Sequence, residues 1–153
     1  MEKVKNKVNR LFLFFIFLLL LGCATDESML VKGSVRVKRI DEIINGLEKA
    51  YNKRDINTFF SFFSSDYDDY DRLKDIFKAL EIYDEIRLEL FVDRILINRE
   101  KISVSIYWEK KLVTAKERHI DRKSGNSLLE LRVINDGEIK VKRIKGEYPF
   151  GLI

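Results

Sequence analysis

The sequence predicts an α+β domain in which N-terminal helices pack against a four-stranded antiparallel sheet. Apolar residues recur at helical spacing from about residue 39 to residue 83, and from Asp84 onward they alternate with polar residues, as in strands that bury one face. Turn signals rich in Asn, Asp and Gly divide the second region into four segments, which predicts a meander. Since the helices come first, we expect them to cover the apolar face of the sheet.

The first predicted helix begins near Arg39 and ends at Ala50-Tyr51. Gly46 interrupts its polar side and is expected to weaken the helix slightly. Its apolar residues fall on one helical face and are Ile40, Ile43, Ile44, Leu47, Ala50 and Tyr51.

Two shorter helices are predicted to follow. Asp55 is expected to cap the first of them, over residues 55–65, because an aspartate side chain can accept a hydrogen bond from a free backbone N–H. Four phenylalanines within "FFSFF" cannot share one stripe, so this helix should be packed on more than one side. Asp68 or Asp69 is expected to cap the next helix, over residues 70–83.

The strand region is divided by three turn signals. "NDG" is the strongest of them, because Asn, Asp and Gly tolerate positive φ. In chain order the prediction is a strand at 84–97 with an irregularity around Val92 to Arg94, a turn at 98–101, a strand from Ile102 that continues towards Ile120, a turn at 121–126, a strand at 127–134, a hairpin turn at 135–137 and a strand at 138–144.

The N-terminus has the pattern of an export signal. A cationic leader precedes the apolar run Leu11–Leu21, which is much shorter than the roughly 20 residues that a spanning helix needs. The run ends in Leu20-Leu21-Gly22-Cys23, which resembles the lipobox of bacterial lipoproteins. The resemblance implies that the Cys23 thiol carries diacylglycerol, that cleavage falls just before it, and that a further acyl chain such as palmitate is added. An ordinary signal peptide with a coincidental cysteine is the alternative.

The predicted organisation follows from this pattern. Residues 1–22 form a lipoprotein signal peptide, residues 23–37 the lipidated Cys23 and a polar tether, and residues 38–153 the folded domain. The expected location is the bacterial cell envelope, outside the cytoplasm and held to a membrane by lipid. Most of the net charge of +4 lies in the leader, so the domain is nearly neutral, which argues against a nucleic-acid partner.

The segments "LEKAYNKRDINTFFSFFSSDYDD" and "GNSLLELRVINDGEIKVKRIKGE" resemble the nuclear-transport-factor-two-like superfamily, which includes SnoaL-like and ketosteroid-isomerase-like proteins. The resemblance spans about residues 38–147. It implies a curved sheet wrapped on the helices as a cone (a cystatin-like roll), whose mouth can hold a ligand, an active site or a protein. Tyr51, Phe63, Trp108 and Leu131 are the residues that we expect to line the cone.

A catalytic set is not evident in the sequence. The tyrosine donor of the isomerases would fall on or near Leu47, which cannot donate, and the inward strand positions show no carboxylate that could act as a base. We therefore expect a non-enzymatic module that binds a small apolar ligand or an envelope protein. The alternatives are a small SnoaL-like or isomerase-like enzyme and a structural component that dimerises through the open sheet face.

We predict no metal and no cofactor. Asp66 and Asp68 could open a calcium loop, but Tyr70, Asp71 and Phe77 stand where such a loop needs a ligand, a glycine and a glutamate. Helix capping explains the acidic cluster better. His119 has no second histidine or nearby cysteine with which to share a zinc ion.

Overall fold

The computed structural model describes residues 27–114, 119–134 and 137–152, and for residues 27–32 only the backbone. The chain divides into two units, 1–36 and 37–153, and the packing described below belongs to the second. Within the described residues, no helix combines the length and the apolar character needed to cross a bilayer.

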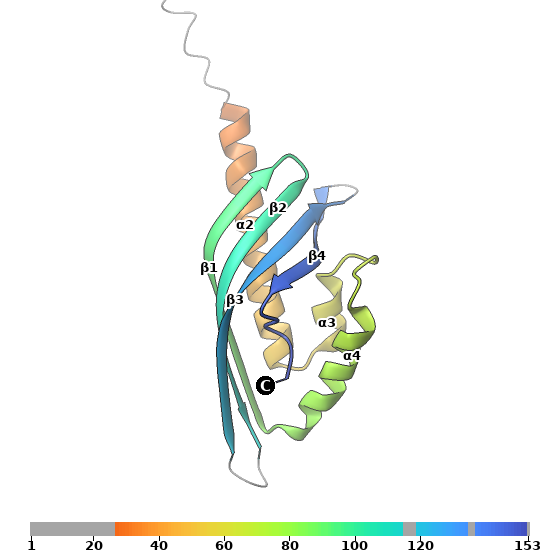
Figure 1. Ribbon diagram of the computed structural model, residues 1–153. Coiled ribbons are helices and arrows are strands. Elements are labelled where there is room, and N and C mark those ends of the chain that lie inside the picture. Colours follow the sequence, from red (N-terminus) through yellow and green to blue (C-terminus); the bar gives the residue numbers. More distant parts are fainter. Residues whose placement is uncertain (1–26, 115–118, 135–136, 153) are drawn as a thin grey trace, which may run out of the picture. The chain divides into compact units, whose positions relative to one another are not determined.

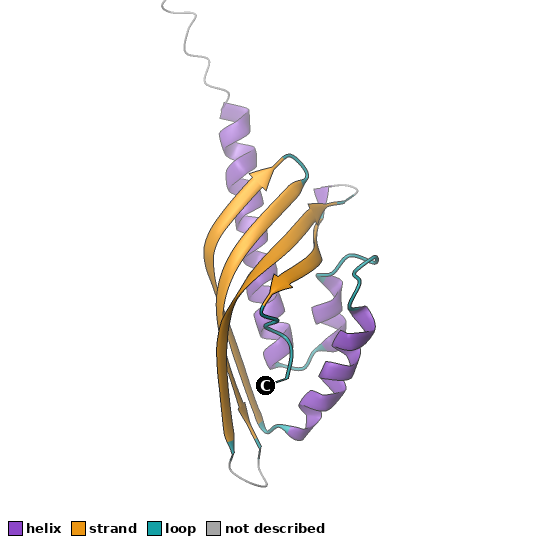
Figure 2. Ribbon diagram, in the orientation of Figure 1, coloured by secondary structure: helices purple, strands orange, loops and turns teal. Residues whose placement is uncertain are grey.

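The order of elements confirms the predicted α+β class. The described helices are α2 (Glu27–Asn52), α3 (Ile56–Ser61), α4 (Tyr70–Ala79) and the 3₁₀ turn η1 (Leu80–Ile82). The described strands are β1 (Glu85–Asn98), β2 (Lys101–Val113), β3 (Ile120–Val133) and β4 (Ile139–Gly146). The strands pair in the order β1-β2-β3-β4, all antiparallel, and the helices α3 and α4 lie on one face of the sheet (Figures 1 and 2).

Helix α2 begins earlier than predicted. The expected start was near Arg39, whereas the helix runs from Glu27. Most side chains from Ser34 to Arg39 are exposed, so this stretch has no apolar face for the sequence to reveal. Extending an existing helix costs far less free energy than starting one. The buried part of α2, from Ile40 onward, provides a formed helix that the preceding residues extend. The division at residues 22 and 37 stays a prediction.

Gly46 has a role that the sequence reading missed. A Cβ atom on Gly46 would overlap the ring of Phe62, which lies just beyond the end of α3. The glycine therefore makes room for an aromatic ring between α2 and the segment after α3. Its low helix propensity is the cost of this close approach.

The predicted Asp55 cap of α3 is confirmed, but the helix is shorter than predicted. The Asp55 carboxylate accepts a hydrogen bond from the backbone N–H of Thr58 at 3.1 Å. The helix ends at Ser61 instead of continuing to residue 65, because the chain then pairs with the edge strand β4. The backbone N–H of Ser64 donates to the carbonyl of Val141 at 2.9 Å, and the N–H of Val141 donates to the carbonyl of Phe62 at 2.8 Å.

Helix α4 starts where predicted and ends in a tighter turn. Asp69 occupies its N-cap position, but the side chain makes no capping hydrogen bond. The acidic residues before it are used differently. Asp66 pairs with Lys142 at 2.7 Å and Asp68 with Arg143 at 3.5 Å, so the turn is docked against β4.

One predicted irregularity of the sheet is confirmed, and one predicted turn is wrong. The register of β1 against β2 shifts between Val92 and Arg94, as expected. The turn predicted at residues 121–126 is wrong, since these residues belong to β3, which pairs antiparallel with β2. Gly125 explains the misleading signal. It pairs with Trp108, and a Cβ there would come 2.8 Å from the indole, so glycine serves packing in a strand.

The β3–β4 hairpin is confirmed by Gly137, which has φ of +80° and donates to the carbonyl of Ile134 at 3.1 Å. The first two residues of the predicted "NDG" turn lie outside the described residues.

Side chains of α2 form hydrogen bonds with backbone groups of the edge strand β1. Asn52 accepts from the N–H of Leu88 at 2.7 Å and donates to its carbonyl at 2.9 Å. Glu48 accepts from the N–H of Leu90 at 2.9 Å. These bonds fix α2 across β1 and block that part of the edge against strand addition.

Candidate functional site

The inner face of β2 forms the floor of the space between sheet and helices. Alternate residues along the strand point inward and are buried: Ile102, Val104, Ile106, Trp108, Lys110 and Leu112. The indole N–H of Trp108 donates to the hydroxyl of Ser127 at 3.0 Å. Lys110 is the exception in this apolar series, and its side chain is only 3% exposed.

The space above this floor is occupied by the chain itself. After β4, residues 147–151, here called the C-terminal segment, run on the helix side of the sheet (Figure 1). Phe150 is completely buried. Its ring centroid lies 4.9 Å from that of Phe59, 5.6 Å from that of Tyr51 and 6.4 Å from that of Phe63. The rings therefore form one aromatic cluster around the segment.

Polar contacts hold the backbone of the C-terminal segment. The Lys110 ammonium donates to the carbonyl of Pro149 at 3.1 Å and also to that of Gly151. The Tyr51 hydroxyl donates to the carbonyl of Phe150 at 3.3 Å. Because buried carbonyls need donors, these contacts let the segment lie in an apolar interior.

A second set of bonds holds the start of the segment. The Ser127 hydroxyl donates to the Glu147 carbonyl, and the Glu147 carboxylate accepts from the N–H of Asn126 at 2.8 Å. The hydroxyls of Tyr67 and Tyr148 lie 3.1 Å apart. The segment is thus fastened at Glu147 and Tyr148 as well as at Pro149 to Gly151.

Burial sets the electrostatics of the interior. It lowers the pKa of Lys110 to about 8, and the nearby charge of Lys123, directly opposite on β3, acts in the same direction. Burial also raises the pKa of Tyr51 well above its usual range, so its hydroxyl stays protonated and can donate. The pKa of Tyr148 is raised in the same way, first by burial and then by its hydrogen bond with Tyr67.

The four residues predicted to line the cone are all buried on its inner side. Tyr51 and Phe63 pack on Phe150, and the Trp108 ring lies 5.4 Å from the Lys110 ammonium. Leu131 pairs with Ile102 and Val141 within the sheet. Whether they line a ligand pocket stays a prediction, because the C-terminal segment takes up the space that they face.

Sequence reasoning missed Phe150 and Lys110. Lys110 was visible in principle, since it continues the inward alternation of β2 from Ile102 to Leu112. Phe150 carried no signal, because it follows the last strand and belongs to no periodic pattern.

The interior offers little for acid–base catalysis. The buried polar and charged side chains among the described residues are Ser64, Lys110 and Ser127, and none of them is a carboxylate. Leu47 is also fully buried and supplies no donor. Within the described part of the chain, no group of three or more acidic, histidine or cysteine side chains could hold a metal ion. His119 is exposed and contacts Asp121 at 2.8 Å.

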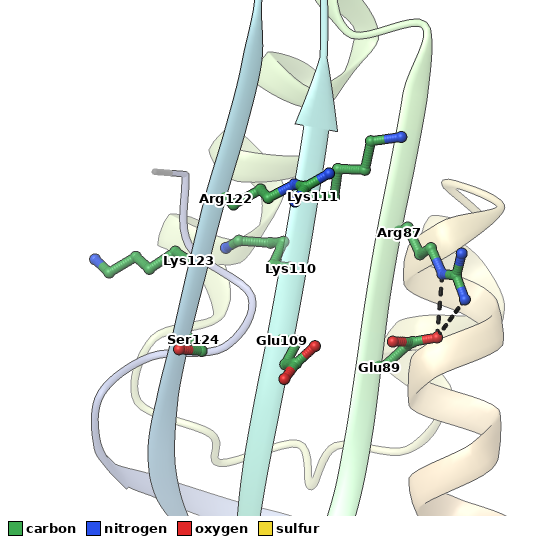
Figure 3. A pocket seen from close by; sticks show the side chains of 8 residues that line it. All are labelled: Arg87, Glu89, Glu109, Lys110, Lys111, Arg122, Lys123 and Ser124. Carbon is green, nitrogen blue, oxygen red and sulfur yellow. Dashed lines mark hydrogen bonds and ion pairs between the residues drawn. The ribbon is translucent and has the colours of Figure 1, made fainter.

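The outer face of the sheet carries two further features. A shallow, charged groove of about 470 Å³ lies across β1, β2 and β3, where Arg87 and Glu89 pair at 2.6 Å (Figure 3). Further along, three apolar side chains of the outer face are partly exposed: Phe91 (48%) with its cross-strand neighbour Tyr107 (37%), and Leu96 (59%), which lies beyond the Arg94–Ser105 pair. The rings of Phe91 and Tyr107 stack with centroids 6.0 Å apart. We call these three residues the outer-face patch.

Solved structures show the same architecture. A protein of the nuclear transport factor 2-like superfamily from Salmonella enterica serovar Typhimurium superposes with a TM-score of 0.63 at 12% identity, covering 73% of this chain and 89% of its own. The chain has the nuclear transport factor 2-like fold. This confirms the fold that the sequence resemblance implied, including helices that precede and cover a four-stranded sheet.

Other solved structures that superpose on this chain carry different functional descriptions. A ketosteroid isomerase-like protein from Erwinia carotovora superposes with a TM-score of 0.56 at 13% identity, covering 69% of this chain and 89% of its own. A type 2 hexachlorocyclohexane dehydrochlorinase superposes with a TM-score of 0.65 at 12% identity, covering 74% of this chain and 85% of its own.

No protein-family model matches the sequence, and a comparison with curated proteins finds no match either. At such identities the likeness concerns the fold alone.

Proposed function

We propose that the chain is a lipid-anchored protein of the bacterial cell envelope whose folded domain binds another protein and catalyses no reaction. The observation that carries the non-catalytic part is the occupied interior. Phe150 fills the position above the inner face of the sheet, and Tyr51 already donates to the Phe150 carbonyl. An acid–base enzyme of this fold would need an open interior with a carboxylate directed into it.

The anchor is proposed from the sequence. The basic leader, the short apolar run and Leu20-Leu21-Gly22-Cys23 support it, and all of them lie outside the described residues. Two or more acyl chains bury enough CH₂ groups for durable attachment, whereas one chain gives only marginal binding. Cys23 is the only cysteine of the chain, so lipidation also accounts for a thiol without a disulfide partner.

The surface proposed for protein binding is the outer-face patch. Exposed, stacked aromatic side chains such as Phe91 and Tyr107 are a feature of interaction surfaces. The partner that we propose is a second copy of this chain, because a sheet face can pack against its own symmetry mate. Charged pairs next to the patch, such as Arg87 with Glu89, would supply a polar rim.

The enzyme alternative draws support from the dehydrochlorinase and from the isomerase-like relative among the solved structures. It would require the C-terminal segment to leave and an acidic residue to turn inward. The binding-module proposal requires neither rearrangement.

Metabolic labelling tests the anchor. In a bacterial host, the wild-type chain should incorporate labelled palmitate, and Cys23→Ser should lose the label and accumulate uncleaved precursor. Ala24→Ser, one residue beyond the four lipobox residues, is the matched control and should keep the label. A labelled Cys23→Ser band would refute lipidation at this cysteine.

A further inference from the structure

Charges of the same sign face one another on the outer side of the sheet. Arg87 on β1, Lys111 on β2 and Arg122 on β3 stand directly opposite one another and form a cationic row. Two residues along the strands, Glu89 and Glu109 pair in the same way and form an acidic row. Like charges in these positions destabilise a sheet. Both rows line the charged groove of the outer face, where Figure 3 shows them at two successive levels.

Ion pairs within the sheet neutralise two of the three cations. Arg87 pairs with Glu89 at 2.6 Å, and Lys111 pairs with Glu85 at 3.0 Å. Arg122 is the exception, because it is exposed and has no hydrogen bond or ion pair with any residue that the structure describes. The cationic row therefore offers a free guanidinium, whose planar fork of N–H donors matches two oxygens of a phosphate.

The acidic row has a matching group without a counter-ion. Within the described ranges Glu109 forms no ion pair, and its carboxylate accepts only from the neutral hydroxyl of Tyr107, at 2.9 Å. Glu109 is the diagonal neighbour of Arg122, since it pairs with Ser124, two residues further along β3. Diagonal neighbours are roughly 7–8 Å apart, within reach of long side chains. The groove thus presents an unpaired cation and an unpaired carboxylate close together, with the exposed Ser124 beside them.

We propose that the charged groove binds a small zwitterion that carries a phosphate and a primary ammonium group a few bonds apart. The phosphate lies on the cationic row and accepts from Arg122, and the ammonium donates to Glu109 in the acidic row. A ligand with only one of the two charges meets repulsion from the other row, so the arrangement selects for both groups together. The proposed function assigns no small ligand to this face, so this inference goes beyond it.

The test uses O-phosphoethanolamine, which carries both groups, and compares it with inorganic phosphate and with ethanolamine, which carry one each. Amide chemical shifts of the isotope-labelled full chain are followed in non-ionic detergent at neutral pH and low ionic strength, where surface charges are least screened. O-Phosphoethanolamine should give saturable shifts along β2 and β3 with a Kd on the order of millimolar, because exposed charge pairs are individually weak. Phosphate and ethanolamine should each bind at least about fivefold more weakly.

Variants locate the site. Arg122→Gln and Glu109→Gln should each weaken binding of O-phosphoethanolamine about fivefold, because each removes one charge and keeps a polar side chain of similar size. Arg132→Gln is the matched control and should bind as the wild type does, since Arg132 is also an exposed arginine of β3 but lies outside the groove. All three positions are exposed, and the amide spectra report whether each variant is folded.

Two sources of this chemistry are distinguished with dihexanoylphosphatidylethanolamine, used below its critical micelle concentration. Binding as tight as that of O-phosphoethanolamine assigns the site to a lipid headgroup, and loss of binding assigns it to a soluble phosphate monoester. The proposal is overturned if inorganic phosphate alone binds as tightly as O-phosphoethanolamine, or if Arg122→Gln retains full binding. The absence of any saturable shift up to about 50 mM O-phosphoethanolamine would equally overturn it.

Discussion

The hydroxyl of Tyr51 donates to the backbone carbonyl of Phe150, a residue 99 positions later in the chain. The two rings also pack, with centroids 5.6 Å apart. This pair joins the end of the long helix α2 to the segment that follows the last strand. Through this contact the residues after β4 fill the interior between the sheet and the helices.

Removal of the Phe150 ring should be costly. Phe150 is completely buried in contact with several other rings, so Phe150→Ala should lower the free energy of unfolding by about 3–5 kcal/mol through lost transfer energy and a residual cavity. Urea denaturation followed by circular dichroism measures the change. Leu152→Ala, at an exposed neighbouring position, is the control and should have little effect. A loss below about 1 kcal/mol for Phe150→Ala would show that the segment is not packed as described.

The two glycines of α2 should respond oppositely to alanine. At Gly33 a Cβ would meet nothing within 4 Å, so Gly33→Ala should be neutral or stabilising by up to about 1 kcal/mol. At Gly46 the Cβ atom would overlap the Phe62 ring, so Gly46→Ala should destabilise the protein. Replacing Phe62 by the smaller leucine should relieve this overlap. Thermal denaturation of each variant and of Gly46→Ala with Phe62→Leu measures the effects. The interpretation fails if Gly46→Ala raises the melting temperature as Gly33→Ala does.

Lys110 should make stability depend on pH. Its folded pKa of about 8 lies below the unfolded value of 10.5, so the unfolded chain binds more protons between these pH values. The free energy of unfolding should therefore rise with pH over this window by something on the order of 3 kcal/mol, because the cost of burying the cation disappears.

The contribution of Lys110 is isolated by comparing variants, since tyrosines titrate above pH 10. The difference in stability between the wild type and Lys110→Met should change between pH 8 and 10, and that between the wild type and Lys101→Met should stay constant. Parallel curves for all three proteins would show that Lys110 is not buried as a cation.

The outer-face patch should control self-association. Phe91→Lys places a charge among exposed apolar side chains on the sheet, and it should shift the full chain in detergent from dimer to monomer in analytical ultracentrifugation. Ile82→Lys, at a position 67% exposed but outside the sheet, should leave the dimer intact. A wild-type monomer, or a dimer that tolerates Phe91→Lys, would rule out the proposed interface.

Patterns that depend on burial were readable from the sequence. The apolar face from Ile40 to Tyr51 and the alternation along β2 follow from helix and strand periodicity, so these parts were predicted. The ends were not, since α2 begins earlier than expected and β2 ends at Val113 instead of continuing towards Ile120. The Asp55 cap followed from local chemistry, because its acceptor lies three residues from its donor.

What failed depended on contacts between distant residues. The Gly125 region was predicted as a turn, because nothing in the local sequence shows that Trp108 needs the space. Gly46 and Phe62 show the same limitation. The position of Phe150 is set by Tyr51, Phe59 and Lys110, which come from three separate elements, so no local pattern could place it.

The most direct test of an interior closed by the C-terminal segment is a nuclear Overhauser measurement between the ring protons of Phe150 and those of Tyr51 and Phe59. We predict strong cross-peaks to both rings, together with Phe150 ring shifts displaced by the neighbouring aromatics. Random-coil shifts for Phe150 and no cross-peak to either ring would contradict this account.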